Sequence, residues 1–294
     1  MRNTLLATLL AVVAVPLPAG AWGFEAHQFI MARAIELLPA PMRPFYEANR
    51  AFLLEHVVDP DLWRIVGFAE EPARHFLDLD AYGTYPFDAL PRDYGAALEK
   101  FGSETLTRNG LLPWRAAEIV GRLRRAFEQQ RRSAPYALDD ARFLSAVVAH
   151  YVADGHVPFH ATLNYDGHLS GQDGVHARFE STLFERNQTR VIVKPGPLRA
   201  VPEPSRLMFD ALLGSFQLAA PLLDADRQAI GSRDVYDDRY YEAFFGKAGP
   251  ILGRCLSDAI TDVASVMVAA WEQAGKPALP IDPQRPAQRR RASP

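Results

Sequence analysis

The chain has 294 residues, a formal net charge of −3 and a hydrophobic content of 48%, which is enough apolar side chain to fill the core of one large domain. The slightly acidic balance excludes a protein that grips nucleic acid through a broad basic surface, although it leaves a narrow binding cleft open. The single cysteine, Cys255, excludes an internal disulfide, so stability must come from core packing or from bound metal.

The first 21 residues read as a secretory signal peptide. They have a basic start at Arg2, an apolar run from Leu5 to Val15, and an ending in small residues that suits a signal peptidase. The apolar run is about half of the ~20 residues that a membrane-spanning helix needs, and no later stretch is both long enough and free of charge. We therefore expect cleavage before Trp22 and a secreted or periplasmic protein with no stable membrane anchor.

Segments with a 3.6-residue hydrophobic period follow along the chain. They predict helices at 24–38, 114–132, 138–155, 174–187, 205–229 and 247–275. Only 190–194, RVIVK, alternates as a strand does, and the long proline-bearing connection from about 59 to 113 is either functional or contains short helices. Residues 276–294 are rich in proline and arginine without periodicity, which is typical of a disordered tail. The pattern predicts an all-α, single-domain helical bundle over residues 22–275.

The stretch AHYVADGHVPFH, residues 149–160, holds three of the eight histidines in the chain. Helical spacing places His150 and Asp154 on a face that continues an apolar stripe, whereas His156 points elsewhere. The helix must end near the following proline, because the residue before a proline is disfavoured in the α region. His160 then lies just beyond the helix end, close to the same face.

The pattern recurs on other helices. His176 and Glu180 lie one turn apart on an apolar face, and His27 lies on the apolar face of the first helix. Taken singly, such a pair is more often a surface interaction, and a lone histidine is more often a hydrogen-bonded core residue. Together they aim imidazole and carboxylate groups at the bundle interior, where unpaired charge is costly. A shared metal cluster removes this conflict.

These motifs resemble those of the superfamily of zinc-dependent phospholipases C and single-strand-specific zinc nucleases. Both families have a mature N-terminal tryptophan, an H-x-x-x-D-x-x-x-P-x-H core and a later H-x-x-x-E or H-x-x-x-D pair. Here these are Trp22, then His150, Asp154, Pro158 and His160, then His176 and Glu180. The matching motifs cover residues 22–186, and beyond them only helical character is similar.

The long connection supplies two further residues by the same resemblance. The run H-F-L-D-L-D, residues 75–80, is similar to the H-F-x-D-x-D run of the phospholipases and makes His75 a ligand. In D-P-D-L-W-R, the preceding proline and the following Arg64 match Asp61 to the family pattern, whereas Asp59 lacks both. We therefore choose Asp61 as the ligand.

The resemblance implies three zinc ions in the bundle. The first would be held by Asp61, His75, His150 and Asp154, the second by His160, His176 and Glu180, and the third by the amino and carbonyl groups of Trp22 with His27 and Asp154. The second site has three protein ligands and keeps a position open, as catalytic zinc requires. Cleavage before Trp22 would free the amino group that the third ion needs.

The resemblance also implies a hydrolase that acts on phosphate esters through a zinc-activated hydroxide. Asp61 would position or deprotonate the attacking water, and the planar fork of Arg64 would neutralise phosphoryl oxygens. A purely structural Arg64, paired with Asp59 or Asp61, is the alternative.

Some sequence features favour a phospholipid substrate and others favour a nucleic-acid substrate. The residues that follow His27, the H-F-L-D-L-D run, the G-V-H-A-R-F-E segment around His176 and the absence of disulfides favour phospholipase C. The five-residue gap from Trp22 to His27 and the D-x-x-R pattern at Asp61 favour a nuclease. We expect a monomeric phospholipase C, with single-stranded nucleic acid as the alternative substrate and a secreted zinc-binding protein without turnover as the non-enzyme alternative.

Overall fold

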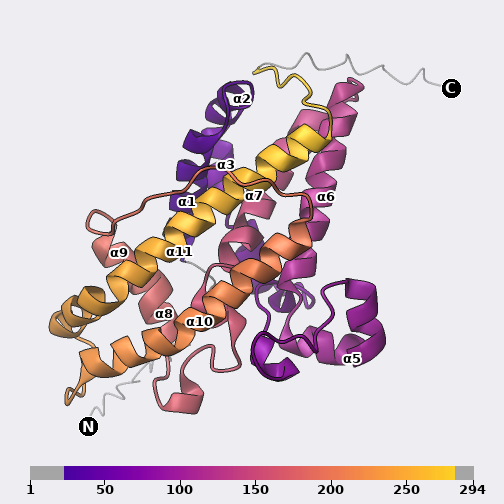
Figure 1. Cartoon of the computed structure of the whole chain (residues 1–294). Coiled ribbons are helices and arrows are strands. Elements are labelled where there is room, and N and C mark those ends of the chain that lie inside the picture. The colour runs from indigo at the N-terminus through magenta and orange to yellow at the C-terminus, as the bar shows by residue number, and fades with distance from the viewer. Residues whose placement is uncertain (1–22, 282–294) are drawn as a thin grey trace, which may run out of the picture.

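The structure is a computed structural model that describes residues 23–281 (Figure 1). The expected signal peptide, Trp22 and residues 282–294 lie outside the described residues. Over residues 23–281 the chain forms helices and no strand, which confirms the prediction of an all-α, single-domain bundle. The RVIVK segment, 190–194, runs as an irregular chain past the last helix, where the Lys194 amide donates to Ser257 Oγ at 2.8 Å.

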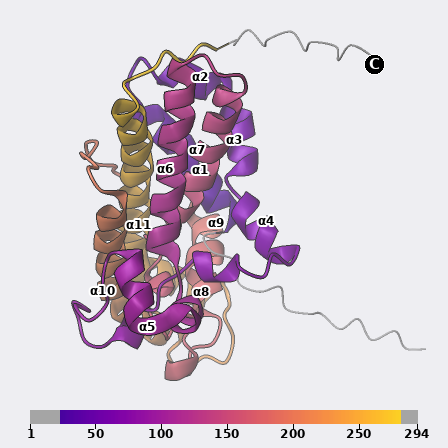
Figure 2. The same cartoon turned by 90° about the vertical axis from the view of Figure 1, so that its right-hand side faces the viewer.

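Five long helices build the bundle, and Figures 1 and 2 show them side by side. They are α1 (Phe24–Leu37), α6 (Leu112–Arg131), α7 (Ala137–Asp154), α10 (Pro204–Ile230) and α11 (Asp238–Gln273). α7 is the central helix and packs against α1, α3, α6 and α11. Every residue from Ser145 to Asp154 is buried, so this part of α7 is enclosed on all sides.

Helices fill the long connection from about 59 to 113, as one of the two sequence interpretations expected. They are α4 (Asp59–Ile65), the 3-10 turns η1 (Pro72–Arg74) and η2 (Leu79–Tyr82), and α5 (Tyr94–Asn109), and the connection is preceded by α2 (Arg43–Ala48) and α3 (Arg50–His56). Prolines stand in the first turn of α4, α6 and α10, where their fixed φ and missing N–H suit a helix start. These prolines therefore begin helices and do not mark disordered loops.

The helix predicted at 174–187 is interrupted. It divides into α8 (Val175–Ala177), the π-helical segment η5 (Arg178–Leu183) and α9 (Phe184–Asn187). The 3-10 turns η3 (Pro158–Ala161) and η4 (His168–Ser170) precede it. π-helical turns are rare in proteins, and those that occur inside α-helices are often found at functional sites.

The C-terminal boundaries also differ from those predicted. α11 begins at Asp238 rather than at residue 247, because the Asp237 side chain caps it by accepting from the Tyr240 amide at 2.9 Å. Residues 276–281, predicted as the start of a disordered tail, pack against α11. There the Trp271 indole donates to the Pro277 carbonyl at 2.8 Å and Leu279 is buried.

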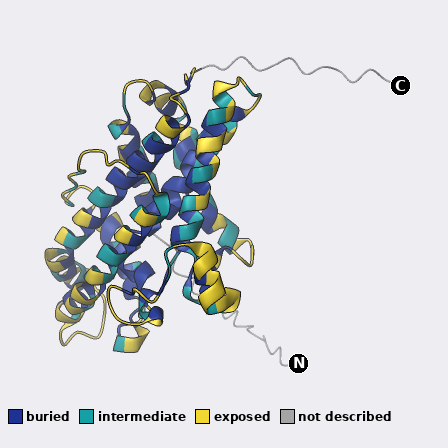
Figure 3. Cartoon of the chain, turned by 45° about the vertical axis from the view of Figure 1, so that its right-hand side comes forward, coloured by how far each residue is buried: buried dark blue, intermediate teal, exposed yellow. Residues whose placement is uncertain are grey.

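The burial pattern separates a core from a solvated shell (Figure 3). The inner faces of the long helices are buried, whereas α5 at one end of the bundle is mostly exposed. Among the described helices, α10 alone is long and apolar enough to cross a membrane by length and composition, a test that core helices also pass. Its buried side, with Met208, Phe209 and Leu212, packs on α11 and α6.

Candidate metal centre

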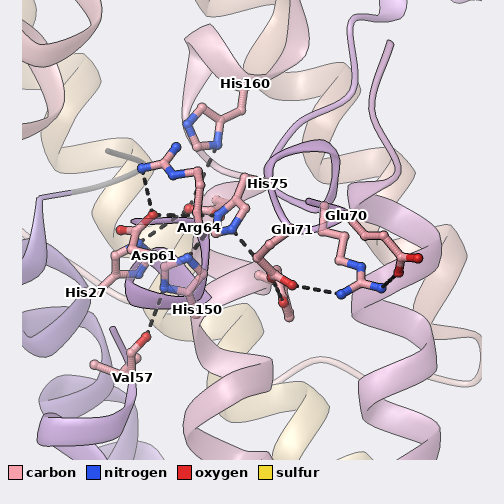
Figure 4. A network of polar contacts seen from close by, with 12 residues as sticks. His27, Val57, Asp61, Arg64, Glu70, Glu71, His75, His150 and His160 are labelled. Atoms are coloured by element: carbon pink, nitrogen blue, oxygen red, sulfur yellow. Dashed lines mark hydrogen bonds and ion pairs between the residues drawn. The ribbon is translucent and has the colours of Figure 1, made fainter. Parts of the chain in front are cut away.

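Histidine and carboxylate side chains from distant parts of the sequence meet inside the bundle at the end of α7 (Figure 4). All predicted ligands within residues 23–281 are buried there: His27, Asp61, His75, His150, Asp154, His160, His176 and Glu180. They come from α1, α4, the segment after η1, the end of α7, η3, α8 and η5. We call these eight residues the metal centre.

Asp154 occupies the middle of the metal centre. Its Oδ2 lies 3.0 Å from His75 Nδ1 and 3.3 Å from His150 Nε2, and its Oδ1 lies 3.4 Å from His27 Nε2 and 3.8 Å from His160 Nδ1. Burial alone would raise the pKa of this carboxyl, but the surrounding histidines, His150 first, lower the pKa well below its usual value. One carboxylate thus faces four imidazoles, as a ligand shared between metal ions would.

The first group of ligand atoms joins His75, His150 and Asp154. His150 Nδ1 lies 2.9 Å from the Val57 carbonyl, so this nitrogen donates and leaves Nε2 with its lone pair toward the centre. His150 Nε2 and His75 Nδ1 are 3.1 Å apart. Two imidazole nitrogens and a carboxylate therefore point at one place.

The chain around His75 is fixed by backbone hydrogen bonds. The Leu77 amide donates to the His160 carbonyl at 2.8 Å, and the Leu112 amide donates to the Phe76 carbonyl at 3.2 Å. Gly110 makes this close approach possible, because a Cβ there would lie 2.1 Å from the Phe76 oxygen and the residue has φ +99°. These contacts fix the position of a segment that has no regular secondary structure.

The second group joins His27, Asp61 and His150. The His27 ring stacks on the His150 ring with centroids 3.9 Å apart, and neither His27 nitrogen nor either Asp61 oxygen has a hydrogen-bond partner. Burial lowers the pKa of His27 and raises that of Asp61. Arg64 Nη2 lies 3.1 Å from Asp61 Oδ1 as an ion pair. The structure thus places His27 beside Asp61 as well as beside Asp154.

The third group is His160, His176 and Glu180, the same set that the resemblance assigns to the second zinc ion. His176 Nε2 lies 2.9 Å and His160 Nε2 3.9 Å from Glu180 Oε2. Burial raises the pKa of the Glu180 carboxyl to about 7, and neither of its oxygens has a hydrogen-bond partner. The π-helical turn η5 carries Glu180 and so sets its position relative to His176 on α8.

The buried polar atoms that lack a hydrogen bond indicate whether these residues fit a metal. Each buried polar atom that lacks a hydrogen bond costs about 1–3 kcal/mol, and the metal centre has many such atoms. They are His27 Nδ1 and Nε2, both oxygens of Asp61, His75 Nε2, Asp154 Oδ1, His160 Nδ1, His176 Nε2 and both oxygens of Glu180. Coordination to metal would satisfy most of them, so the buried groups could hold metal ions.

A cavity of about 540 Å³ opens on the metal centre. Arg64, His75, His160 and His176 form the part next to the metal centre, and the rest is formed by Pro72, Phe76, Asp78, Arg108, Phe159, Tyr165 and Asp166. Asp78 is buried and its Oδ1 has no hydrogen-bond partner. Burial, with the nearby charge of Asp80, raises the pKa of Asp78 to about 7. Because His160 and His176 belong to its lining, the cavity reaches two of the three residues in the third group.

Two residues that the sequence left aside lie apart from the metal centre. His156 Nε2 lies 3.2 Å from Asp262 Oδ2 on α11, which agrees with the prediction that His156 points elsewhere. Asp59 Oδ2 lies 2.8 Å from His56 Nδ1, so the geometry favours Asp61 over Asp59 as the ligand.

Sequence reasoning missed Glu71, which is buried beside His75, and Asp78 in the cavity wall. Glu71 precedes His75 by four residues, a spacing that could have been noticed. No periodic segment surrounds the pair, so nothing in the pattern predicted their contact.

The resemblance to zinc-dependent phospholipases and nucleases is confined to the motifs described. The chain matches no known family model, and no similar curated protein is found for it. Trp22, expected as a ligand of the third ion, lies outside the described residues. The structure accordingly shows a buried cluster of histidine, aspartate and glutamate side chains with the capacity to hold metal ions.

Proposed function

We propose that the protein is a zinc-dependent hydrolase of phosphate esters, with phospholipase C as its activity. One observation carries the proposal: three groups of buried ligand atoms, most of them unpartnered and two of the groups sharing His150, lie beside a cavity of about 540 Å³. A metal that served only structure would have a closed ligand shell, whereas a catalytic metal keeps an open position. The third group has three ligands, two of which, His160 and His176, line the cavity, and so it has the catalytic form.

The donor atoms support zinc as the metal. Imidazole nitrogen and carboxylate oxygen are ligands that zinc accepts at short distance, and no thiolate belongs to the set. In the proposal three ions are bound, and the third also takes Trp22, which precedes Gly23 at the start of α1. Zinc bound here would lower the pKa of a water ligand toward ~7 and hold the oxygens of a phosphoryl group.

Asp61 and Arg64 are the proposed catalytic side chains. Asp61, in the first turn of α4, orients the attacking water and accepts its proton. Arg64 lies one turn later on the same helix, with its Nη2 3.1 Å from Asp61 Oδ1 and its side chain on the cavity wall. A guanidinium there can bind two phosphoryl oxygens at once. Its ion pair with Asp61 fixes the positions of both side chains relative to each other.

Exposed apolar side chains that are close in sequence to cavity residues favour a phospholipid substrate. Ile65, Val66 and Phe68 directly follow Arg64 and are 55%, 71% and 61% exposed. Leu169, 68% exposed, lies in the 3-10 turn η4, four residues after the cavity residue Tyr165. Apolar patches of this kind are uncommon on proteins that contact only water and are typical of surfaces that meet another apolar phase.

A single-strand-specific nuclease is the second candidate. Arg64 and Arg108 line the cavity together with Phe76 and Tyr165. Arginines that hold phosphates and aromatic rings that stack on bases are the usual components of a single-strand binding groove. The two candidates share the metal centre and differ only in what the outer part of the cavity accepts.

A side-by-side assay on phosphatidylcholine vesicles and single-stranded DNA tests the proposal. The protein is loaded with zinc, its metal content is measured, and the Asp154→Asn variant is the inactive control. Release of a phosphorylated head group supports phospholipase C, and cleavage of DNA alone replaces it with the nuclease. Bound zinc with no hydrolysis of either substrate, or of bis-p-nitrophenyl phosphate between about pH 5 and 9, would leave a zinc-binding protein without turnover.

A further inference from the structure

His75 meets the metal centre differently from His150. Its Nδ1 faces Asp154 at 3.0 Å, and its Nε2 points away from the centre toward Glu71 Oε1 at 3.6 Å (Figure 4). This distance is that of an ion pair and is longer than a hydrogen bond, which requires an approach closer by roughly half an ångström. The histidine therefore has carboxylates on both of its nitrogens: Asp154, with Asp61 Oδ1 at 3.8 Å, on Nδ1 and Glu71 on Nε2.

Glu71 is itself fixed in place. It is 1% exposed, its Oε2 accepts from Arg74 Nη1 at 2.8 Å, and its Oε1 accepts from the Tyr151 hydroxyl. The buried carboxylate is thus held by partners on two sides, and its Oε1 also faces the outer nitrogen of His75.

We propose that Glu71 is a positioning residue that keeps the proton of His75 on Nε2 and so directs the Nδ1 lone pair to the metal. Histidines that bind metal almost always donate their other N–H to a carboxylate or a carbonyl, which fixes the tautomer and strengthens the ligand. The Val57 carbonyl has this role for His150. Glu71 has it for His75, and the inference rests on the metal binding proposed above.

A purely structural role for Glu71 would be to hold Arg74 against the short helix η1. Glu70 supplies the matched control, because its Oε2 also accepts from Arg74, at 2.8 Å from Nη2, while its side chain is 85% exposed. Glu70 has no contact with a histidine among the contacts that the structure gives it. Glu70→Gln and Glu71→Gln therefore each remove one carboxylate from Arg74, and only Glu71→Gln changes the environment of His75.

The experiment measures zinc affinity by competition with a chelator in both variants and in the unmutated protein. Glu71→Gln is expected to weaken zinc binding about 10- to 100-fold, while Glu70→Gln leaves it unchanged. In the zinc-loaded protein, the ¹⁵N NMR signals of His75 should show Nε2 protonated and Nδ1 metal-bound, and Glu71→Gln should shift the Nε2 signal. Equal zinc affinities for the two variants, with unchanged His75 signals, overturn the inference.

Two further measurements keep the outcomes separate. If Glu71→Gln does not fold, Tyr151→Phe removes one hydrogen bond from Glu71 without touching the carboxylate, and a smaller loss of zinc affinity is expected. An unchanged affinity in Tyr151→Phe then counts against the inference. If the unmutated protein binds no zinc, the proposed function fails; if it binds zinc and Glu71→Gln binds it equally well, only the role of Glu71 fails.

Discussion

Two buried polar clusters lie in the same bundle and differ in how far the protein satisfies them. In one, which we call the Arg178 network, Arg178 pairs with Asp226 at 3.1 Å and also donates to Tyr240, while Gln172 donates to Asp226 at 2.7 Å. None of these side chains has an unpartnered buried atom. The metal centre, by contrast, leaves most of its ligand atoms without partners.

The difference is most direct within η5. Arg178 and Glu180 are two residues apart on this π-helical turn and belong to opposite clusters. Buried charge is tolerated when its partners are complete and is costly when they are not. The Arg178 network is complete with protein atoms alone, whereas the metal centre has unpartnered atoms that bound metal could satisfy.

The largest effect is expected from Asp154→Asn. Asp154 faces four histidines, and the neutral amide removes the one charge that all of them share. Zinc content should fall below that of the unmutated protein, and hydrolysis should fall by more than about 100-fold, since even residues that only orient a ligand cost 10- to 100-fold. Metal analysis and the phosphodiesterase assay measure both. Full zinc content with full activity would contradict the assignment of Asp154 as the shared ligand.

Asp226→Asn applies the matching change to the Arg178 network. Arg178 would remain buried without its charged partner, which typically destabilises a protein by about 3–5 kcal/mol. The loss should be the same in excess zinc and in chelator, because the Arg178 network needs no metal. Denaturant unfolding under both conditions measures it. A loss that appears only with zinc present would mean that the two clusters are coupled through η5.

Helix geometry could predict half of the metal centre from the sequence, because two pairs of its ligands are one helical turn apart, whereas Asp61 and His75 were expected only from the resemblance. His150 with Asp154 and His176 with Glu180 fall on apolar faces, so their inward direction follows from helix geometry. Glu71 and Asp78 could not be found in this way. They lie in irregular segments, where the direction of a side chain is set by tertiary contacts.

Tertiary contacts and local caps, which periodicity does not show, also explain where the predicted helix boundaries differ from the structure. The π-helical turn η5 shifts the register of a helix that periodicity describes as continuous. α11 begins early because of the Asp237 cap, which comes before any apolar period begins. The segment after Gly275 was judged by its composition, and composition does not include the anchoring of Pro277 by Trp271.

Asp78 is an intermediate case that sharpens the contrast. It is a buried carboxylate with neither histidines nor a basic partner, and its pKa is raised to about 7. Because the carboxyl ionises near pH 3.9 in the unfolded chain, stability should fall as pH rises from about 4 to about 7. Asp78→Asn should remove this fall and stabilise the protein by about 2–4 kcal/mol above pH 7. Denaturant unfolding at pH 4 and pH 8 measures it, and equal gains at both pH values would refute it.

His156→Asn should have the smallest effect. It breaks the contact with Asp262, which also pairs with Arg199 at 3.2 Å, and about 1–2 kcal/mol of stability should be lost. Zinc stoichiometry should not change, because His156 faces away from the metal centre. A variant that loses one zinc ion per chain would place His156 among the ligands after all.

The metal centre draws its side chains from elements that lie far apart along the chain, from His27 on α1 to Glu180 on η5. In terms of chain topology, each ion bound there would act as a cross-link. An ion shared by His27, Asp61 and His150 would close two long loops at once and remove much of the conformational entropy that the unfolded chain gains. Disulfides provide this constraint in many proteins, and this chain has one cysteine. Metal binding would then stabilise the part of the bundle from His27 to Glu180, in addition to the catalytic role proposed for it.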